Sequence, residues 1–310
     1  MILIFLFILV IICFFSKSKI NNFKIKKKND IMNLHKSNEY IIYKIKKNKP
    51  FLISRCASEA DVAYKYVKNK KIINPKNLSN NAGIYSRSDK DVKIYAQKYN
   101  ECIKNSDCMA CFPNLFNMFQ NYFCDLYNLP KINNRTIEPF YLLSENIKPW
   151  SNYLSNKTVL IVNPFTESMK TQLNNNFQIF RDKNKKIFED QQNIKFYKSF
   201  NTSAGNHIHY NWIETFNIMK NDIKKINFDI ALLGCGGYGL PLCNFIFKDL
   251  NKSAIYVGGG LQLYFGIMGK RWKETDYWKK IIQEENPKFI SPSGDEILKN
   301  NTKVEGGCYW

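Results

Sequence analysis

The stretch that decides the fold is Phe228–Gly239, which reads FDIALLGCGGYG. Its first six residues are apolar apart from Asp229, as is typical of a buried strand, and its last six, Gly234–Gly239, fit the pattern G-x-G-x-x-G. A helix is expected over residues 241–250 and another strand over residues 254–257. A glycine-rich turn between a strand and a helix lets backbone amides and the helix dipole meet a phosphate. The stretch therefore predicts a strand–helix–strand unit with an anion site at its turn.

The same alternation of strands and helices extends upstream of this unit. Apolar and β-branched runs predict further strands over residues 51–54, 158–162 and 194–200. Apolar residues at helical spacing predict helices over residues 60–67, 89–103, 109–129, 167–177 and 212–223. Alternating strands and helices build parallel sheets with helices on both faces. The expected fold class is therefore α/β, with a Rossmann-like parallel sheet flanked by helices.

A second glycine-rich strand end, Gly258–Gly260, follows the strand expected over residues 254–257. A nicotinamide site would carry an acidic residue at this strand end to hold the ribose hydroxyls, and none is present. Two neighbouring glycine-rich ends instead suit a diphosphate lying across the carboxyl edge of the sheet. The alternative is a pair of tight turns without a ligand. The glycines expected to admit the diphosphate are Gly234, Gly236, Gly239, Gly258 and Gly259.

Polar residues downstream of the second glycine run are candidates for substrate contact. Gln262 follows the glycines directly, and the basic pair Lys270 and Arg271 precedes Trp272. Two cations beside an aromatic ring are suited to hold a diphosphate and to stack a base or a sugar. The alternative is a solvated basic loop with a packed tryptophan.

The N-terminal segment predicts a membrane anchor. Residues 1–15, MILIFLFILVIICFF, are apolar apart from one cysteine, and lysines follow them. By the positive-inside rule this pattern indicates a single-pass membrane protein whose soluble part is cytoplasmic. A cleaved signal peptide and a buried helix are the alternatives. Residues 16–49 are expected to be a basic linker, residues 50–150 an N-terminal α/β half, and residues 151–310 a Rossmann-like C-terminal half.

Composition narrows the class of protein. The chain has 310 residues, 45% of them apolar, with 46 Lys and Arg against 26 Asp and Glu, so its formal net charge is +20. This charge suits anionic partners; the alternative, which we favour, is a general bias of composition toward lysine. No concentrated basic stripe with interleaved aromatic residues is visible, so a nucleic-acid partner is not expected.

The nine cysteines are odd in number and scattered, which argues against a disulfide framework. Cys108 and Cys111 have the spacing of half a zinc site, and Cys102 and Cys124 could complete four thiolate ligands, although at unusual spacing. The alternative is that these cysteines are ordinary core residues.

Three stretches of the chain resemble a family of largely uncharacterised proteins whose bacterial members are often associated with surface-polysaccharide synthesis. They are Asn227–Leu242, Val257–Trp272 and Val304–Trp310, and the resemblance continues upstream through Asn163–Ser168, Asn81–Gly83 and the span from Arg55 to Glu59. It covers nearly everything from residue 50 onward. That family is distantly similar to GT-D-type glycosyltransferases, which have a Rossmann-like α/β fold and hold a metal–sugar-nucleotide complex with an Arg-x-Gly-Asp-Gly-Glu-like motif.

The resemblance implies a nucleotide-sugar donor, a glycan or lipid-linked acceptor and the membrane as partners. It places Arg55 and Glu59 where the first and last residues of the motif stand, and Asn81 among the substrate-binding residues. The matching segment is one residue shorter and has no Asp at the metal position, so a need for Mn²⁺ or Mg²⁺ stays open and no metal ligand is assigned. Glu59 and Glu167 are the candidate bases for the acceptor hydroxyl, and caps of helix N-termini are their alternative roles.

The expected function is transfer of a sugar from a nucleotide-sugar donor to a glycan or lipid-linked acceptor. Glu305, beside two glycines near the C-terminus, either folds back onto the site or caps the sheet. His207 and His209 stand in a polar loop, as a base, half a metal site, or residues without a role. Two other functions are considered: a different Rossmann-like nucleotide-dependent transferase, such as a methyltransferase, and a non-catalytic membrane-anchored protein that binds nucleotides or sugars.

Overall fold

The computed structural model describes residues 30–72 and 76–310, and the elements below belong to this part of the chain. Its seven strands form one sheet in which every neighbouring pair is parallel, in the order β3-β2-β1-β7-β6-β4-β5. The strands are β1 (Leu52–Arg55), β2 (Cys108–Cys111), β3 (Lys131–Asn133), β4 (Val159–Asn163), β5 (Ile194–Lys198), β6 (Ile230–Leu233) and β7 (Ser253–Tyr256). The prediction of an α/β fold with a parallel sheet is confirmed.

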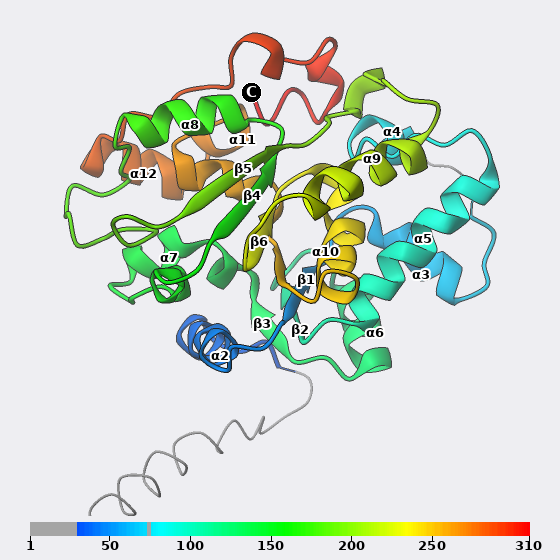
Figure 1. Cartoon of the computed structure of the whole chain (residues 1–310), viewed down its shortest axis with the longest axis horizontal. Coiled ribbons are helices and arrows are strands. Elements are labelled where there is room, and N and C mark those ends of the chain that lie inside the picture. The colour runs from blue at the N-terminus through cyan, green and yellow to red at the C-terminus, as the bar shows by residue number, and fades with distance from the viewer. Residues whose placement is uncertain (1–29, 73–75) are drawn as a thin grey trace, which may run out of the picture. The chain divides into compact units, whose positions relative to one another are not determined.

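Helices cover both faces of the sheet (Figure 1). One face carries α3 (Ala60–Val67), α5 (Asp89–Lys104), α6 (Asn117–Tyr127), α9 (Trp212–Lys224) and α10 (Gly239–Lys248). The other carries α2 (Leu34–Lys46), α7 (Pro139–Ser144), α8 (Thr166–Asn174) and α12 (Asp276–Glu285). Two short helices, α4 (Lys76–Asn80) and α11 (Lys270–Lys273), complete the described set.

The strands belong to two hydrophobic cores at once. In β4, Leu160 and Val162 pack into the core beneath α9 and α10, whereas Val159 and Ile161 pack into the core beneath α8. Successive side chains of a strand point to opposite faces, so a strand covered on both sides must be apolar at every position. This requirement explains why the sequence of β4 reads as a continuous apolar run rather than an alternating one.

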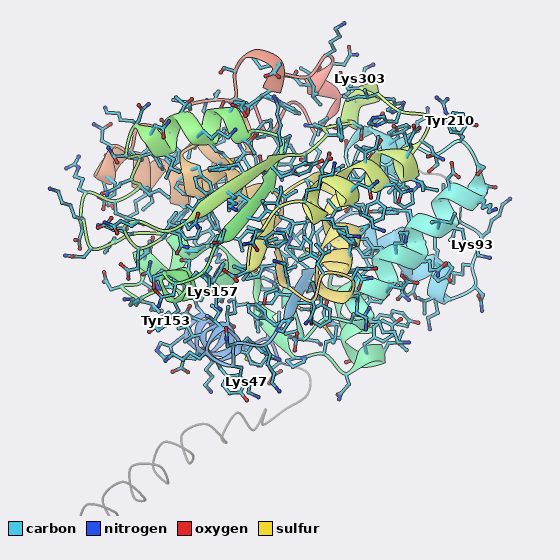
Figure 2. The ribbon with its side chains drawn as sticks, viewed as in Figure 1. Lys47, Lys93, Tyr153, Lys157, Tyr210 and Lys303 are labelled. Carbon is cyan, nitrogen blue, oxygen red and sulfur yellow. The ribbon has the colours of Figure 1, made fainter. Side chains whose placement is uncertain are left out.

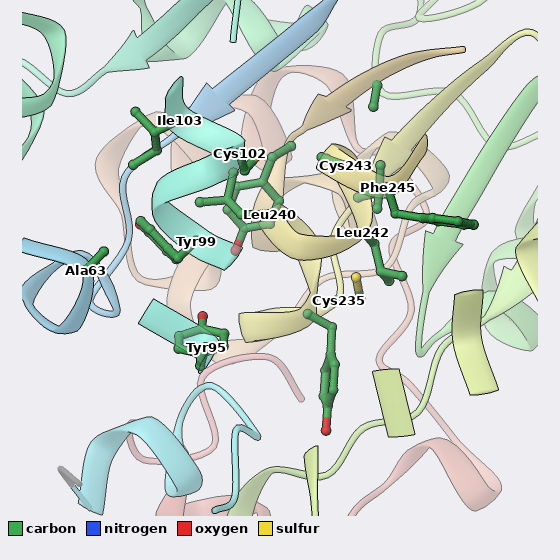
Figure 3. Close-up of a cluster of buried hydrophobic side chains, with 14 of the residues drawn as sticks. Ala63, Tyr95, Tyr99, Cys102, Ile103, Cys235, Leu240, Leu242, Cys243 and Phe245 are labelled. Atoms are coloured by element: carbon green, nitrogen blue, oxygen red, sulfur yellow. The ribbon is translucent and has the colours of Figure 1, made fainter. Parts of the chain in front are cut away.

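Aromatic residues and thiols fill the core between α5 and α10. Tyr95, Tyr99 and Cys102 of α5 face Leu240 and Cys243 of α10, and all five are buried (Figure 3). Burial raises the pKa of the Cys102 and Cys243 thiols well above the usual range. These cysteines therefore act as small apolar packing groups. The eight cysteines that the structure describes are all free thiols.

The segment expected to be one core helix over residues 109–129 is instead strand β2 followed by helix α6. The strand is only four residues long and is buried on both faces, and periodicity does not separate such a short apolar run from a buried helix. Phe116, with a φ of 57°, takes the left-handed conformation immediately before α6, which marks where the helix begins.

Strand β2 also corrects the zinc alternative. Cys108 and Cys111 are three positions apart on a strand, so their side chains leave opposite faces of the sheet. Cys108 lies in the core beneath α2 and α7, and Cys111 lies in the core beneath α5 and α6. A structural zinc ion needs four ligands around one point, and these two thiols do not converge on one.

Residues Ile31–Trp310 form one compact unit. Helix α2 lies within the stretch expected to be a linker over residues 16–49, and its Ile41 and Ile45 are buried in the core. The two halves expected on either side of residue 150 share one sheet, because β1 of the first pairs with β7 of the second. Helix α2 was not predicted because polar residues and lysines surround the few apolar residues that it buries.

Across residues 30–72 and 76–310, no helix is both long and apolar enough to cross a membrane. This finding corrects the expectation of a single-pass membrane protein with a cytoplasmic soluble part. The anchor expected over residues 1–15, and the linker residues up to 29, lie outside the described residues.

Lysines are spread around the periphery of the described unit. Lys47, Lys93, Lys157 and Lys303 lie at widely separated places in Figure 2. This arrangement fits a composition rich in lysine rather than a single binding stripe.

Candidate functional site

A cavity of about 750 Å³ lies at the carboxyl edge of the sheet. Parallel strands all end at the same edge, and residues that follow each of the seven described strands line the cavity. After β4 the chain passes to α8 on one face, and after the neighbouring β6 it passes to α10 on the other. A crevice at such a reversal is the usual ligand site of an open α/β sheet.

The glycines of the first turn are required by packing within the protein. A Cβ on Gly234 would lie 2.5 Å from the Gly258 carbonyl oxygen, one on Gly236 would lie 2.9 Å from the Ala82 carbonyl oxygen, and one on Gly239 would lie 2.1 Å from the Tyr256 ring. Gly234 and Gly236 line the cavity, and Gly239 does not. Close approach of the chain to itself requires glycine at these three positions, and the expected contact with a phosphate stays a prediction.

The second glycine run makes room for side chains of the site. A Cβ on Gly258 would lie 2.3 Å from Nη2 of Arg55, and one on Gly260 would lie 1.8 Å from Oε1 of Glu138. A Cβ on Gly259 would lie 2.6 Å from the Tyr309 ring. All three glycines line the cavity. The run thus brings an arginine, a carboxyl group and an aromatic ring against the backbone, and the expected contact of Gly258 and Gly259 with a diphosphate stays a prediction.

Arg55 stands at the end of β1 with its guanidinium between two rings. The guanidinium carbon lies 5.1 Å from the Phe112 ring centroid and 5.5 Å from that of Tyr256. Among the described residues it makes no hydrogen bond and no ion pair, and its Nε is buried without an acceptor. A buried donor left unpaired is costly, and an acceptor bound in the cavity would remove that cost.

Glu59 follows β1 and lies just before α3. Its side chain is only 6% exposed, lines the cavity and makes no capping hydrogen bond to the helix. The Ser58 hydroxyl lies 3.5 Å from its Oε2. Burial raises the pKa of the Glu59 carboxyl, and the nearby charge of Arg55 opposes that rise. The helix-cap alternative is therefore corrected, and the carboxyl faces the site.

Glu138, which sequence reasoning missed, is a second carboxyl group in the cavity. It follows β3 and precedes Pro139, the first residue of α7. Burial raises the pKa of its carboxyl to about 7, while the charges of Arg55 and Arg135 pull it down. A carboxyl that titrates near neutrality is suited to accept or deliver a proton. The only local signal was a glutamate directly before a helix-starting proline.

The C-terminal segment folds back over the cavity. Arg271 makes an ion pair with Glu305, its Nη1 donates to the Tyr309 hydroxyl over 3.1 Å, and its guanidinium lies 4.7 Å from the Tyr309 ring centroid. Glu305 and the two glycines after it all have positive φ angles, 48°, 72° and 81°. These residues turn the chain so that Tyr309 reaches Gly259, and the fold-back expected for Glu305 is observed.

The other predicted site residues divide into two groups. Asn81 and Gln262 line the cavity, and the Gln262 amide donates to the carbonyl oxygens of Ile267 and Tyr309. Lys270 is exposed and does not line it. Glu167 is also exposed and outside it, and a hydrogen bond from Lys170 lowers the pKa of its carboxyl. The structure therefore does not bring Glu167 and Lys270 together with Arg55 and Glu59.

The two loop histidines lie outside the cavity lining. The His207 ring stacks on Tyr85 with centroids 4.0 Å apart, and Nδ1 of His209 lies 2.9 Å from the Thr215 hydroxyl. Within residues 30–72 and 76–310, no group of three or more His, Cys, Asp and Glu residues is placed to hold a metal ion. Neither histidine is thus part of a described metal centre.

A buried carboxylate joins the C-terminal region to α8. Glu296 is 3% exposed, and its carboxylate accepts hydrogen bonds from the amides of Glu167 and Ser168, 2.9 and 3.3 Å long, and from the Ser168 hydroxyl. The Trp310 indole nitrogen donates to the Glu296 carbonyl oxygen over 2.8 Å. Glu296 therefore caps α8 from a distant part of the chain.

We expect Glu296→Ala to lower the free energy of unfolding by about 3 kcal/mol, because three donors at the start of α8 lose their acceptor. Urea denaturation followed by circular dichroism measures this loss. The matched control is Asp295→Asn, which removes an exposed ion pair with Lys198 and should leave the free energy of unfolding nearly unchanged. Equal effects of the two variants would contradict the capping role.

Comparison with known proteins adds little to this geometry. No family model matches the chain, and no curated protein matches it. A solved structure described as the selenomethionine-substituted structure of domain of unknown function 1792 is 14% identical, with a TM-score of 0.42, and covers 87% of this chain and 93% of its own. A likeness at this level carries no argument about function. The function is therefore argued from the residues that line the cavity.

Proposed function

We propose that the cavity binds a nucleotide-sugar donor and transfers the sugar to a hydroxyl of a glycan or lipid-linked acceptor. The observation that carries the proposal is the guanidinium of Arg55, which has no acceptor among the described residues and lies beside two carboxyl groups, those of Glu59 and Glu138. A diphosphate supplies the missing acceptor. The carboxyl groups supply a place for the proton that an acceptor hydroxyl gives up.

In the proposed reaction, the acceptor oxygen forms a bond to the anomeric carbon of the donor sugar. The bond from that carbon to the diphosphate oxygen breaks, and the electron pair leaves with the diphosphate. The hydroxyl proton passes to the carboxylate of Glu138, with Glu59 as the alternative recipient. Charge that develops on the leaving diphosphate is stabilised by Arg55, whose position between Phe112 and Tyr256 is already set before binding.

The size and lining of the cavity support a ligand of this class. About 750 Å³ lies within the range of roughly 300–1,000 Å³ that small-molecule and cofactor sites occupy. Rings of Phe116, Tyr141 and Trp310 also line it, and aromatic faces stack on bases and sugars. Polar and apolar surfaces are therefore both available to a ligand that combines a base, a sugar and phosphates.

The test is a panel of nucleotide sugars and nucleoside diphosphates against the full chain, read by thermal shift and by release of nucleoside diphosphate. We expect at least one donor to raise the melting temperature and to be hydrolysed or transferred. Protection by S-adenosylmethionine alone would favour a methyltransferase instead. Binding without any turnover would favour a non-catalytic binding protein, and no binding at all would contradict the proposal.

A further inference from the structure

Arginine, not lysine, supplies the positive charge of the cavity. The chain contains 46 Lys and Arg residues, and only five of them are Arg. Three of the five, Arg55, Arg135 and Arg271, line the cavity, whereas no lysine of the described residues does. In a chain where lysine is so abundant, this placement indicates that the site requires the guanidinium group itself rather than positive charge in general.

A guanidinium differs from an ammonium group in ways that matter for phosphate binding. It is planar and presents paired donors that match two oxygens of a phosphate. Arg55 is fixed between two rings, Arg271 lies on the Tyr309 ring, and the Arg135 guanidinium carbon lies 5.0 Å from the Tyr141 ring centroid. Stacking of this kind orients each fork in advance, which lowers the entropy lost when an anion binds.

The carboxyl groups of the cavity are poorly arranged for a divalent cation. Three of them line it, those of Glu59, Glu138 and Glu305, and each comes from a different segment. The charge of Arg55 acts on Glu59 and on Glu138, and Arg271 is ion-paired with Glu305. Each carboxyl therefore already has a guanidinium neighbour, which would repel a cation brought to the same place.

The donor set implied for a metal by the resemblance to GT-D-type enzymes is also incomplete. The segment from Arg55 to Glu59 contains no Asp, and the described residues hold no group of three or more metal-ligating side chains in position. Mg²⁺ and Mn²⁺ prefer several oxygen ligands in near-octahedral geometry. The residues present fit a cation poorly, and they fit a dianion well.

We infer that the site holds the donor diphosphate with the guanidinium groups of Arg55, Arg135 and Arg271, and without a divalent cation. The inference rests on the proposed function, since it describes how that same donor is bound. In this mode of binding, the guanidinium groups of the arginines, rather than a bridging metal ion, neutralise the charge of the leaving diphosphate.

The first test is isothermal titration of UDP and GDP into the full chain, in EDTA and again with MnCl₂ or MgCl₂. We expect the dissociation constant to change less than about threefold between the conditions. Binding that disappears in EDTA and returns with metal would overturn the inference while leaving the proposed function intact. If neither diphosphate nor any donor binds under either condition, the proposed function fails instead.

Glu59→Gln gives a test in which the two modes of binding predict opposite signs. If Glu59 were a metal ligand, the variant would weaken diphosphate binding; because it is a negative charge beside Arg55, we expect binding to tighten severalfold. Glu145→Gln, which removes an exposed carboxyl outside the cavity, is the matched control and should leave the dissociation constant unchanged. Weaker binding by Glu59→Gln, in a variant with normal circular dichroism, would overturn the inference.

The variant Arg55→Lys tests whether the paired donors of the guanidinium group are needed in addition to its positive charge. Lysine keeps the charge but loses the paired donors, and we expect diphosphate binding to weaken roughly tenfold, as one charge-assisted hydrogen bond of about 1.4 kcal/mol implies. Arg181→Lys, at an exposed arginine outside the cavity, should have no effect. Full affinity in Arg55→Lys would contradict the requirement for a guanidinium.

Discussion

Replacing Arg55 by alanine should weaken the binding of a nucleoside diphosphate roughly 100-fold, because about 3 kcal/mol of charge-assisted, bidentate hydrogen bonding is lost. The protein itself loses little, since the guanidinium makes no hydrogen bond or ion pair with the described residues and its Nε is buried without an acceptor. We expect the melting temperature without ligand to stay close to that of the wild type. Isothermal titration and thermal shift measure the two quantities separately.

The control for this variant is Arg181→Ala, which removes an exposed arginine that does not line the cavity. It should bind the diphosphate as the wild type does. If Arg55→Ala bound with unchanged affinity, Arg55 would not be the anion contact. If the variant instead unfolded at a much lower temperature, the guanidinium would be a packing group between Phe112 and Tyr256 rather than a ligand contact.

The second large effect concerns Glu138 and pH. Burial raises the pKa of its carboxyl to about 7, and a general base works only when it is deprotonated. The transfer rate should therefore rise about tenfold per pH unit below pH 7 and level off above it. In Glu138→Gln this limb should disappear, and the plateau rate should fall roughly 100- to 10,000-fold. A pH–rate profile of both proteins measures these effects.

Stability gives an independent check on the same group. A carboxyl whose pKa is higher in the folded protein than in the unfolded chain is bound to more protons when folded, so stability falls as pH rises from about 4.5 to about 7. Glu138→Gln removes this loss, and its melting temperature should exceed that of the wild type at pH 8 but not at pH 4. The exposed Glu145→Gln should show no such difference. In the pH–rate profile, a rise of the transfer rate below pH 7 that persists in Glu138→Gln would assign the base to Glu59.

Arg55 and Glu138 should also be coupled, because the charge of Arg55 lowers the pKa of the Glu138 carboxyl. In Arg55→Ala we expect the limb of the pH–rate profile to move to higher pH. This shift would be measured on the residual activity at saturating donor. If the pH dependence of the rate stayed unchanged in Arg55→Ala, the charge of Arg55 would not affect the Glu138 carboxyl.

Sequence reasoning predicts five of the seven described strands, because most of these are apolar or β-branched runs that end at recognisable turn residues. The strand expected over residues 158–162 is β4 (Val159–Asn163), and the helix expected over residues 212–223 is α9 (Trp212–Lys224). It fails at β2, which lies in a stretch rich in Phe, Leu and Met that continues into α6, and at β3, which has only three residues. Periodicity alone does not separate a short apolar strand from the start of a buried helix.

The site is predicted in part for the same kind of reason. Arg55, Glu59 and Arg271 lie beside motifs that stand out along the chain, and all three line the cavity. For the glycines, the sequence does not show what each one packs against, because the partners lie elsewhere in the chain, such as Tyr256 against Gly239. Glu138 was missed because the glycine run that creates its place lies more than a hundred residues later.

A structure of the full chain crystallised with UDP or GDP tests the central claim most directly. We expect the diphosphate oxygens within about 3.2 Å of the guanidinium nitrogens of Arg55, at the carboxyl edge of the parallel sheet. A nucleotide bound elsewhere, or a diphosphate in the cavity that leaves Arg55 without an acceptor, would contradict it.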